Sequence, residues 1–240
     1  MSRNAMSRTF DDARRWARIG TELFTGAADL DESGMNASSL LPGWTRKHLI
    51  AHVAANADAL GNLVHRAATG EPRPMYASPE ERADGIERGA RMPAAELTAR
   101  LHRSTGKLAE STDALTEEQW RSSVVTAHGR TVPATELPWM RSREVCVHAV
   151  DLGGGPTFAD LPDDFLTALC DDVAAKRAAE EGPALVLEAT DTGATWTLPG
   201  DGASTTLAGP LHEITAYLTG RAHTLTTPGG GPVPALTRWL

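Results

Sequence analysis

The sequence contains few cysteines and no long apolar segment. Cys146 and Cys170 are the only cysteines among 240 residues, and neither lies in a C-x-x-C pattern. Two such cysteines form no disulfide framework of the kind that small secreted domains use. No apolar run approaches the roughly 18 residues of a membrane span. The N-terminal residues also lack the apolar core of a secretory signal, so we expect a cytoplasmic protein with reduced thiols.

Lysine is also scarce. It occurs only at Lys47, Lys107 and Lys176, which leaves 20 of the 23 basic residues as arginine. Acidic residues number 31, and the formal net charge is −8. A nucleic-acid-binding protein usually presents a basic face, so this balance argues against that class. The preference for arginine, with abundant alanine and glycine, is typical of a GC-rich bacterial genome.

The first part of the chain has the apolar periodicity of amphipathic helices. Thr9 and Thr45 are predicted N-caps, Ser78 with Glu81 resembles a capping box, and Gly70 is a plausible helix stop. The segment 31–39 is expected to be a loop, and the segment 122–132 is expected to be briefly extended. Helices are predicted over the segments 9–27, 45–70, 78–91, 93–115, 116–120 and 138–152. We therefore expect residues 1–155 to form an antiparallel helix bundle.

The pattern changes after the glycines at 153–155. Residues 161–180 read as a helix, 184–200 as two strands around a D-x-G turn, 203–210 as a third strand and 209–221 as a helix. Residues 156–240 are therefore predicted to form a small α+β domain. The predicted fold class is mainly α: a four-helix bundle followed by this domain.

Glu144 and His148 are the first candidates for chemistry. They lie four residues apart on a predicted helix, so both side chains project from one face, about 5–6 Å apart at Cβ. Carboxylate and imidazole are common Zn²⁺ ligands. By itself the pair is a weak signal, because a hydrogen bond or ion pair between the two explains the same spacing.

Two further histidines, His48 and His52, lie one turn apart on the helix predicted after Thr45. Either one alone reads more simply as a histidine satisfied within the core. A bundle, however, lets ligands from different helices converge in its interior. His52, Glu144 and His148 would then form a His₂Glu set with one Zn²⁺ position open, as in catalytic sites. Cys146 lies about 200° around the helix from Glu144, so we expect it to face away.

The segments WTRKHLIAHV and WMRSREVCVHAVDLG resemble the DinB/YfiT-like metal-binding helix bundles, and more closely the mycothiol-dependent maleylpyruvate isomerase family. PMYASPEER, GRTVPATELPWMRSREV and the ending RWL strengthen this resemblance, which covers nearly the whole chain. It implies a DinB-like four-helix bundle, a small α+β domain, and a metal triad at His52, Glu144 and His148. It also implies functional arginines at Arg82 and Arg221.

The resemblance implies cis–trans isomerisation of maleylpyruvate to fumarylpyruvate, with mycothiol and a divalent metal, Zn²⁺ or another ion, as cofactors. A thiolate would add to the conjugated double bond, the adduct would rotate, and the thiolate would leave. Arg82 and Arg221 would bind the carboxylates of the substrate, because the arginine side chain suits bidentate pairing.

Two alternatives stay open at this point. The first is a mycothiol S-transferase that acts on other electrophiles, and the second is a metal-binding module without turnover. We expect a monomer that binds a small dicarboxylate and a low-molecular-weight thiol, with no nucleic-acid or membrane partner.

Overall fold

The computed structural model describes residues 8–237 and residue 239. Residues 1–7, 238 and 240 lie outside the described residues. The prediction that the N-terminus lacks a signal segment, and two residues of the ending RWL, fall on them. The chain divides into two compact units, one formed by Thr9–Pro156 and one formed by the residues from Thr157 onward with Arg8. None of the described helices is both long enough and apolar enough to cross a membrane.

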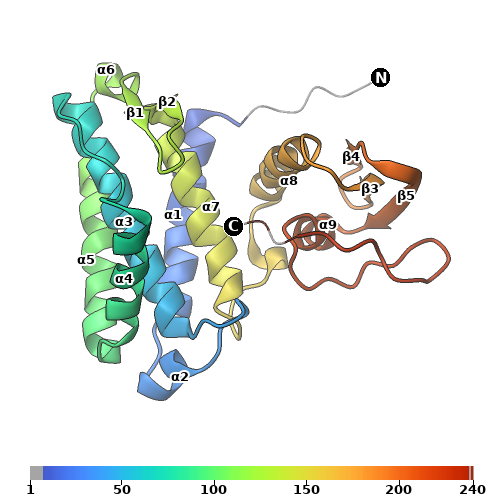
Figure 1. Ribbon diagram of the computed structural model, residues 1–240, viewed down its shortest axis with the longest axis horizontal. Helices are drawn as coiled ribbons and strands as arrows, with labels where there is room; N and C mark the ends of the chain where they lie inside the picture. Colours follow the sequence, from blue (N-terminus) through green and yellow to red (C-terminus); the bar gives the residue numbers. More distant parts are fainter. Residues whose placement is uncertain (1–7, 238, 240) are drawn as a thin grey trace. The chain divides into compact units, whose positions relative to one another are not determined.

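The unit Thr9–Pro156 is built mainly from helices, of which α1, α3, α5 and α7 are the long members of a bundle (Figure 1). Helix α1 packs along α7, and α3 packs against α4, α5 and α7. A short antiparallel hairpin, β1 with β2, and a 3₁₀ turn, Ala134–Glu136, precede α7. The bounds of the elements are α1 Phe10–Ala27, α2 Glu32–Asn36, α3 Arg46–Thr69, α4 Pro79–Ala90, α5 Ala94–Asp113, α6 Glu117–Trp120, β1 Ser123–Val125, β2 Thr131–Pro133 and α7 Leu137–Asp151.

The helix ends follow from local side-chain chemistry. The Thr9 hydroxyl accepts a hydrogen bond from the Asp12 amide at 3.1 Å, and the Asp12 carboxylate accepts one from the Thr9 amide at 3.3 Å. Ser78 accepts a hydrogen bond from the Glu81 amide at 3.1 Å at the start of α4. Helix α3 ends where Gly70 adopts a left-handed conformation with φ of 80°. Each cap satisfies backbone groups that the helix leaves unpaired, so the predictions at these positions are confirmed.

One local prediction is wrong. The sequence predicts a loop over the segment 31–39, but this segment contains the short helix α2, Glu32–Asn36. The Asp31 carboxylate caps this helix by accepting a hydrogen bond from the Gly34 amide at 2.7 Å. Five residues are too few to show helical periodicity in a sequence, whereas the single cap is sufficient to start one turn.

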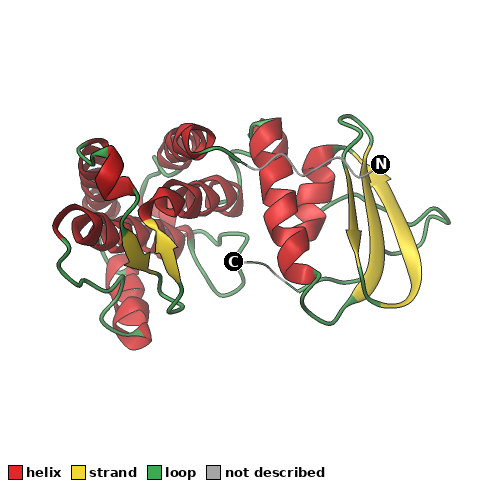
Figure 2. Cartoon of the chain, turned by 90° about the horizontal axis from the view of Figure 1, so that it is seen from above, coloured by secondary structure: helices red, strands yellow, loops and turns green. Residues whose placement is uncertain are grey.

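The unit from Thr157 onward contains a three-stranded sheet with helices on it (Figure 2). The strand order is β4-β3-β5; β3 pairs antiparallel with β4 and parallel with β5. Helices α8 and α9 pack against each other, α8 also contacts β4, and α9 contacts β3 and β5. The bounds are α8 Asp163–Arg177, β3 Pro183–Ala189, β4 Thr195–Leu198, β5 Asp201–Gly209 and α9 Leu211–Leu218, after a 3₁₀ turn at Phe158–Asp160. A helical bundle followed by a small α+β unit is the predicted fold class, which is therefore confirmed.

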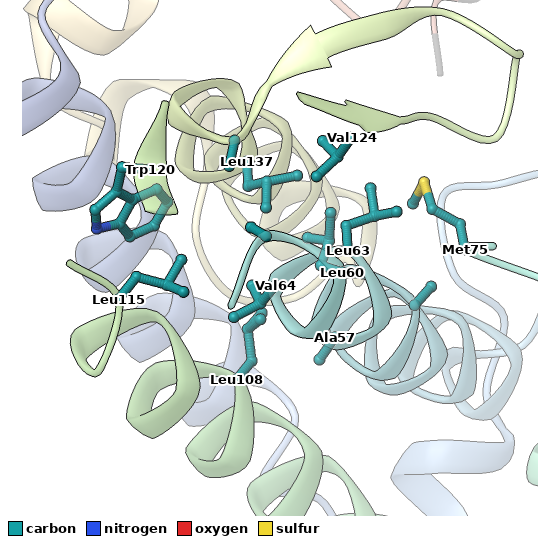
Figure 3. Close-up of a cluster of buried hydrophobic side chains, with 13 residues drawn as sticks. Ala57, Leu60, Leu63, Val64, Met75, Leu108, Leu115, Trp120, Val124 and Leu137 are labelled. Atoms are coloured by element: carbon teal, nitrogen blue, oxygen red, sulfur yellow. The ribbon is translucent and has the colours of Figure 1, made fainter. Parts of the chain in front are cut away.

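A cluster of buried apolar side chains lies where α3 meets α5, α6 and the start of α7 (Figure 3). Leu60, Leu63 and Val64 of α3 contribute to it, as do Trp120 of α6 and Leu137 of α7. Burying a large apolar side chain stabilises a fold by about 1.5–3 kcal/mol. This cluster therefore fixes the start of α7 on α3, and so sets the position of the polar side chains farther along both helices.

Candidate metal centre

Three potential metal ligands lie on the two helices that this core joins. Helix α3 carries His52, and α7 carries Glu144 and His148 one turn apart. Both histidines are buried, at 5% and 3% exposure. Burying an imidazole without hydrogen-bond partners costs free energy. Both histidines are therefore expected to have polar partners inside the bundle.

The ligand atoms of these residues point at one another. His52 Nε2 lies 3.0 Å from Glu144 Oε2, and His148 Nε2 lies 3.5 Å from the same oxygen. The imidazole ring centres of His52 and His148 are 5.1 Å apart. One ligand atom from each of the three residues falls within 4.8 Å of the others. The structure thus brings together the His₂Glu set that the spacing along the chain predicts.

The electrostatics of the cluster keep Glu144 ionised. Burial by itself raises the pKa of this carboxyl, but the hydrogen bonds from His148 and His52 outweigh burial and hold the pKa of Glu144 well below its ordinary value. Burial lowers the pKa of His52, which favours the neutral imidazole that binds metals. An anionic carboxylate beside two imidazole nitrogens is a suitable donor set for a divalent cation, which binds imidazole in its neutral form.

A second carboxylate orients His148. Asp151 is fully buried, and its Oδ2 lies 2.9 Å from His148 Nδ1. This contact occupies one ring nitrogen and directs the other, Nε2, towards Glu144. Burial lowers the pKa of His148, but the hydrogen bonds with Asp151 and Glu144 reverse this and raise it. A ligand histidine whose far nitrogen meets a carboxylate is a recurrent feature of zinc sites.

Arg82 lies on the other side of His52. Its Nη2 is 3.3 Å from His52 Nδ1, and its guanidinium carbon lies 5.7 Å from the centre of the Tyr76 ring. Burial raises the pKa of Tyr76, so the phenol stays protonated beside the arginine. The indole of Trp44 packs edge-on against His52, with the ring centres 5.6 Å apart. An arginine and an aromatic side chain therefore flank the ligand cluster.

The remaining candidates from the sequence lie elsewhere. His48 Nδ1 lies 3.3 Å from the Thr45 amide and 2.7 Å from its hydroxyl, and its Nε2 lies 3.5 Å from Glu87, so it caps α3 and is not in the cluster. Cys146 faces away from Glu144, with its thiol 3.7 Å from the Trp16 carbonyl oxygen. Cys170 lies 3.2 Å from the Thr215 hydroxyl. Burial raises the pKa of both thiols, as expected of inert core cysteines.

Arg221 belongs to the unit that follows Thr157. It is buried there at 7% exposure, and its Nη1 donates to the main-chain oxygens of Thr219, at 2.7 Å, and Trp239. The structure accordingly groups Arg82 with the three ligands, and gives Arg221 partners within its own unit.

The donor set fits a divalent metal. Two imidazole nitrogens and one carboxylate oxygen are the ligands of several catalytic zinc sites, in which they leave one position open for a further ligand. The buried carboxylate of Asp151 supplies the outer support that such sites have.

Comparisons with known proteins agree with this description. A family model described as the mycothiol maleylpyruvate isomerase N-terminal domain matches residues 16–153, which include all three ligands, Asp151 and Arg82. The chain belongs to the mycothiol maleylpyruvate isomerase family. A crystal structure of the mycothiol-dependent maleylpyruvate isomerase is similar over 97% of this chain and 98% of that one, with 38% sequence identity and a TM-score of 0.91. A histidine-to-alanine variant of that enzyme gives the same values. A comparison with curated protein sequences found no match.

Three residues around the ligand cluster have no role in the predictions from the sequence. Asp151 lies three residues after His148, a helical spacing that could have identified it as a partner. Tyr76 and Trp44 lie in segments without regular periodicity, so no pattern in the sequence could place their rings beside Arg82 and His52.

Proposed function

We propose that this chain is a metal- and mycothiol-dependent maleylpyruvate isomerase that converts maleylpyruvate to fumarylpyruvate. The observation that carries this proposal is the convergence of His52, Glu144 and His148 within 4.8 Å, inside the segment that matches the isomerase family. Zn²⁺ is the metal we propose, although the same donor set also suits other divalent ions. We further propose that the protein is a cytoplasmic monomer.

The reaction needs a nucleophile that can add and leave again. A thiolate sulfur forms a bond to one carbon of the double bond, and the displaced electron pair moves to the conjugated carbonyl oxygen. The former double bond is now single, so it rotates. The enolate then re-forms the double bond and expels the thiolate, so no atom is gained or lost overall.

The thiol must come from outside the protein. Cys146 and Cys170 are fully buried, and burial raises the pKa of both thiols, to about 12 for Cys170. Neither lies in the ligand cluster, and both are protonated near neutral pH. A divalent metal at the cluster supplies the positive charge that keeps a bound thiol deprotonated. These observations favour a low-molecular-weight thiol such as mycothiol over a cysteine of the chain.

Arg82 is the residue we propose for binding a substrate carboxylate. Arginine can only donate, so the contact with Arg82 requires His52 Nδ1 to accept and places the imidazole proton on Nε2. When Nε2 serves as a metal ligand, the proton must instead lie on Nδ1, which then accepts nothing. With a metal on Nε2, His52 would no longer accept a hydrogen bond from Arg82, whose guanidinium would then be available for bidentate pairing with a substrate carboxylate. A second carboxylate contact from Arg221 stays a prediction of the sequence.

The proposal is tested by assaying maleylpyruvate turnover by the metal-loaded chain with mycothiol, with glutathione and with no thiol. We expect turnover that requires mycothiol. Equal rates under all three conditions would remove the addition mechanism. Conjugation of mycothiol to a simple electrophile, with no isomerisation of maleylpyruvate, would assign the chain as an S-transferase instead. Metal retention without either activity would indicate a non-catalytic metal-binding module.

The residue assignments need a separate measurement. Elemental analysis of His52→Ala, Glu144→Ala and His148→Ala should show loss of metal, and full occupancy in all three would refute the ligand set. Arg82→Ala should keep its metal but lose about 100-fold in kcat/KM, because it removes a charged hydrogen bond to substrate worth about 2–3 kcal/mol.

A further inference from the structure

A second cavity lies in the helical unit, separate from the metal centre. It has a volume of about 470 Å³ and is lined by side chains of α1, α5 and α7, with Leu60 of α3 and Trp120 of α6. Its apolar lining includes Leu60, Leu108, Trp120 and Leu137, all of which are labelled in Figure 3. None of the three metal ligands lines it. The volume lies within the range of sites that bind small molecules.

One charged side chain lines this cavity from a buried position. Arg141 of α7 is only 5% exposed. Its Nη1 donates to the Val53 main-chain oxygen at 2.9 Å and to Asn56 Oδ1 at 2.8 Å, both of which are neutral acceptors. Its Nε is buried and meets no hydrogen-bond partner among the described residues. Among the residues that the structure describes, no carboxylate lies close enough to form an ion pair with Arg141.

A buried cation of this kind is costly without an anion. Burial lowers the pKa of Arg141 to about 10, against the opposing effect of the more distant Glu144, so the guanidinium stays charged at neutral pH. Buried charges in proteins are normally paired, because desolvation of a lone ion costs several kcal/mol. Arg141 Nε has no accessible surface, but Nη2 makes no hydrogen bond among the described residues, so this nitrogen can donate to an anion that enters the cavity.

The rim of the cavity limits the charge of that anion. Arg14 is already paired with Asp113 at 2.9 Å. Asp11, Arg18 and Glu22 of α1 are exposed and line the same cavity, so these three side chains leave one net negative charge at its rim. Among the residues that line the cavity, Arg141 is the buried cation, so the cavity favours a ligand with one negative group over a ligand with two. The apolar lining favours a hydrocarbon or aromatic body for the rest of the ligand.

We propose that this cavity binds a small monocarboxylate with an apolar body, the carboxylate paired with Arg141 and the body packed against Leu60, Leu108 and Trp120. The guanidinium suits a carboxylate because it carries a permanent charge, and Nη2 can donate a charge-assisted hydrogen bond to the carboxylate. The site is independent of the proposed isomerase activity and is chemically unlike a site for a dicarboxylate substrate.

The test uses the metal-loaded full chain with fluorinated benzoate, and with the matching neutral benzamide as a control probe. Binding is followed by fluorine NMR and by titration calorimetry. We expect benzoate to bind at least about tenfold more tightly than the amide, which corresponds to about 1.4 kcal/mol. Benzoate that binds no better than the amide, or does not bind at all, would overturn the proposal.

Two variants on one helix locate the binding site. Ala109 and Ala95 are both exposed on α5, but only Ala109 lines the cavity. Ala109→Trp should fill the cavity and weaken benzoate binding by at least about tenfold, whereas Ala95→Trp should change it by less than about twofold. Both positions are exposed and neither is a candidate metal ligand, so both variants are expected to fold. Equal affinities in the two variants would refute this location.

Variants of two arginines separate this cavity from the metal centre. Arg141→Met should abolish the preference for benzoate over the amide, with circular dichroism and metal content showing that the protein is intact. Arg82→Ala should leave benzoate binding unchanged. Binding that is lost in Arg82→Ala and retained in Ala109→Trp would show that the carboxylate binds at the metal centre, which would contradict the proposal.

Discussion

At the scale of single residues, Asp151 is the side chain that we expect to orient a ligand of the proposed metal centre. It is fully buried and lies 2.9 Å from His148 Nδ1. Because an imidazole can present only one nitrogen to a metal while the other is held, this carboxylate fixes which nitrogen of His148 faces Glu144. Outer partners of this kind typically affect metal affinity by 10–100-fold.

Asp151→Asn should therefore weaken zinc binding by about tenfold or more while leaving the fold intact. The amide keeps the shape of the carboxylate but loses the charge that raises the basicity of the imidazole. A competition titration against a chromophoric chelator measures the effect. Asp160→Asn, which alters an exposed carboxylate in the other unit, is the control and should bind zinc as the parent chain does. Equal affinity in the two variants would contradict the role of Asp151.

The sequence alone could locate this site only in part. The spacing of Glu144 and His148 placed both on one helix face, but it could not choose between His48 and His52. Helix α3 is buried on nearly all sides, from Leu49 to Val64, so its apolar pattern marks no single inward face. Which histidine meets Glu144 depends on how α7 packs on α3 and on the hydrogen bond that holds His48 at the start of α3. The apolar periodicity of the sequence predicts neither contact.

At the scale of elements, close contact between α1 and α7 positions the helix that carries two of the ligands. A Cβ atom added at Gly20 of α1 would lie 2.6 Å from Val145 Cγ2 and would also meet the Cys146 thiol. Gly26, on the same helix, has nothing within 4 Å of such an atom. The two glycines therefore allow the contact to be tested within one helix.

Gly20→Ala should destabilise the protein by about 1–3 kcal/mol, because the helices must separate to admit the methyl group. Gly26→Ala should instead be neutral or stabilise it by up to about 1 kcal/mol, through the higher helix propensity of alanine. Denaturation by urea measures both free energies of unfolding. A Gly20→Ala chain as stable as Gly26→Ala would show that α1 and α7 do not pack this closely.

The short helix α2 joins two longer helices through Glu32. Its carboxylate accepts hydrogen bonds from the buried Lys47 of α3 and from the Ala94 amide, at 2.7 Å, where α5 begins. The hydrogen bond from Lys47 is the main cause that lowers the pKa of Glu32 from 4.5 to about 2. A carboxyl whose pKa is lower in the folded state stabilises that state above its unfolded pKa, and this stabilisation is lost as the pH falls.

Glu32→Gln should accordingly lower the stability at neutral pH, and the difference from the parent chain should shrink between pH 4.5 and about 2. Urea denaturation of both chains at about pH 7 and about pH 3 measures this change. A difference that stays constant with pH would mean that the charge of Glu32 contributes nothing to the junction of α2, α3 and α5.

Elements fixed by interactions between nearby residues could be predicted from the sequence, whereas those fixed by contacts between distant residues could not. Helix caps at Thr9, Ser78 and Gly70 were predictable because each acts within a few residues. Three strands were also predicted in the second unit. Their order was not, because the parallel pairing of β3 with β5 is a contact between segments separated by β4, and the residues of either strand alone do not specify it.

At the scale of the whole molecule, the proposed metal centre belongs to one compact unit. The three ligands, Asp151 and Arg82 all lie within Thr9–Pro156. A ligand stabilises the folded elements that bind it, so the effect of a metal should be concentrated where its ligands lie.

Hydrogen exchange with and without zinc should show increased protection of amides in α3 and α7, with little change in β3, β4 and β5. Mass spectrometry of peptides from the full chain resolves these segments. Protection that rises equally in both units, or in neither, would contradict a metal site built from α3 and α7 alone.

The claim that a metal held by His52, Glu144 and His148 binds the thiol has one most direct test. The three proposed protein ligands supply nitrogen or oxygen, and both cysteines are buried outside the cluster, so we expect a thiolate sulfur at the metal to come from an added thiol. X-ray absorption at the zinc edge, before and after addition of mycothiol, detects the atoms bound to the metal. We predict nitrogen and oxygen neighbours alone before addition, and one sulfur neighbour afterwards. A spectrum without sulfur in the presence of saturating mycothiol would contradict the account.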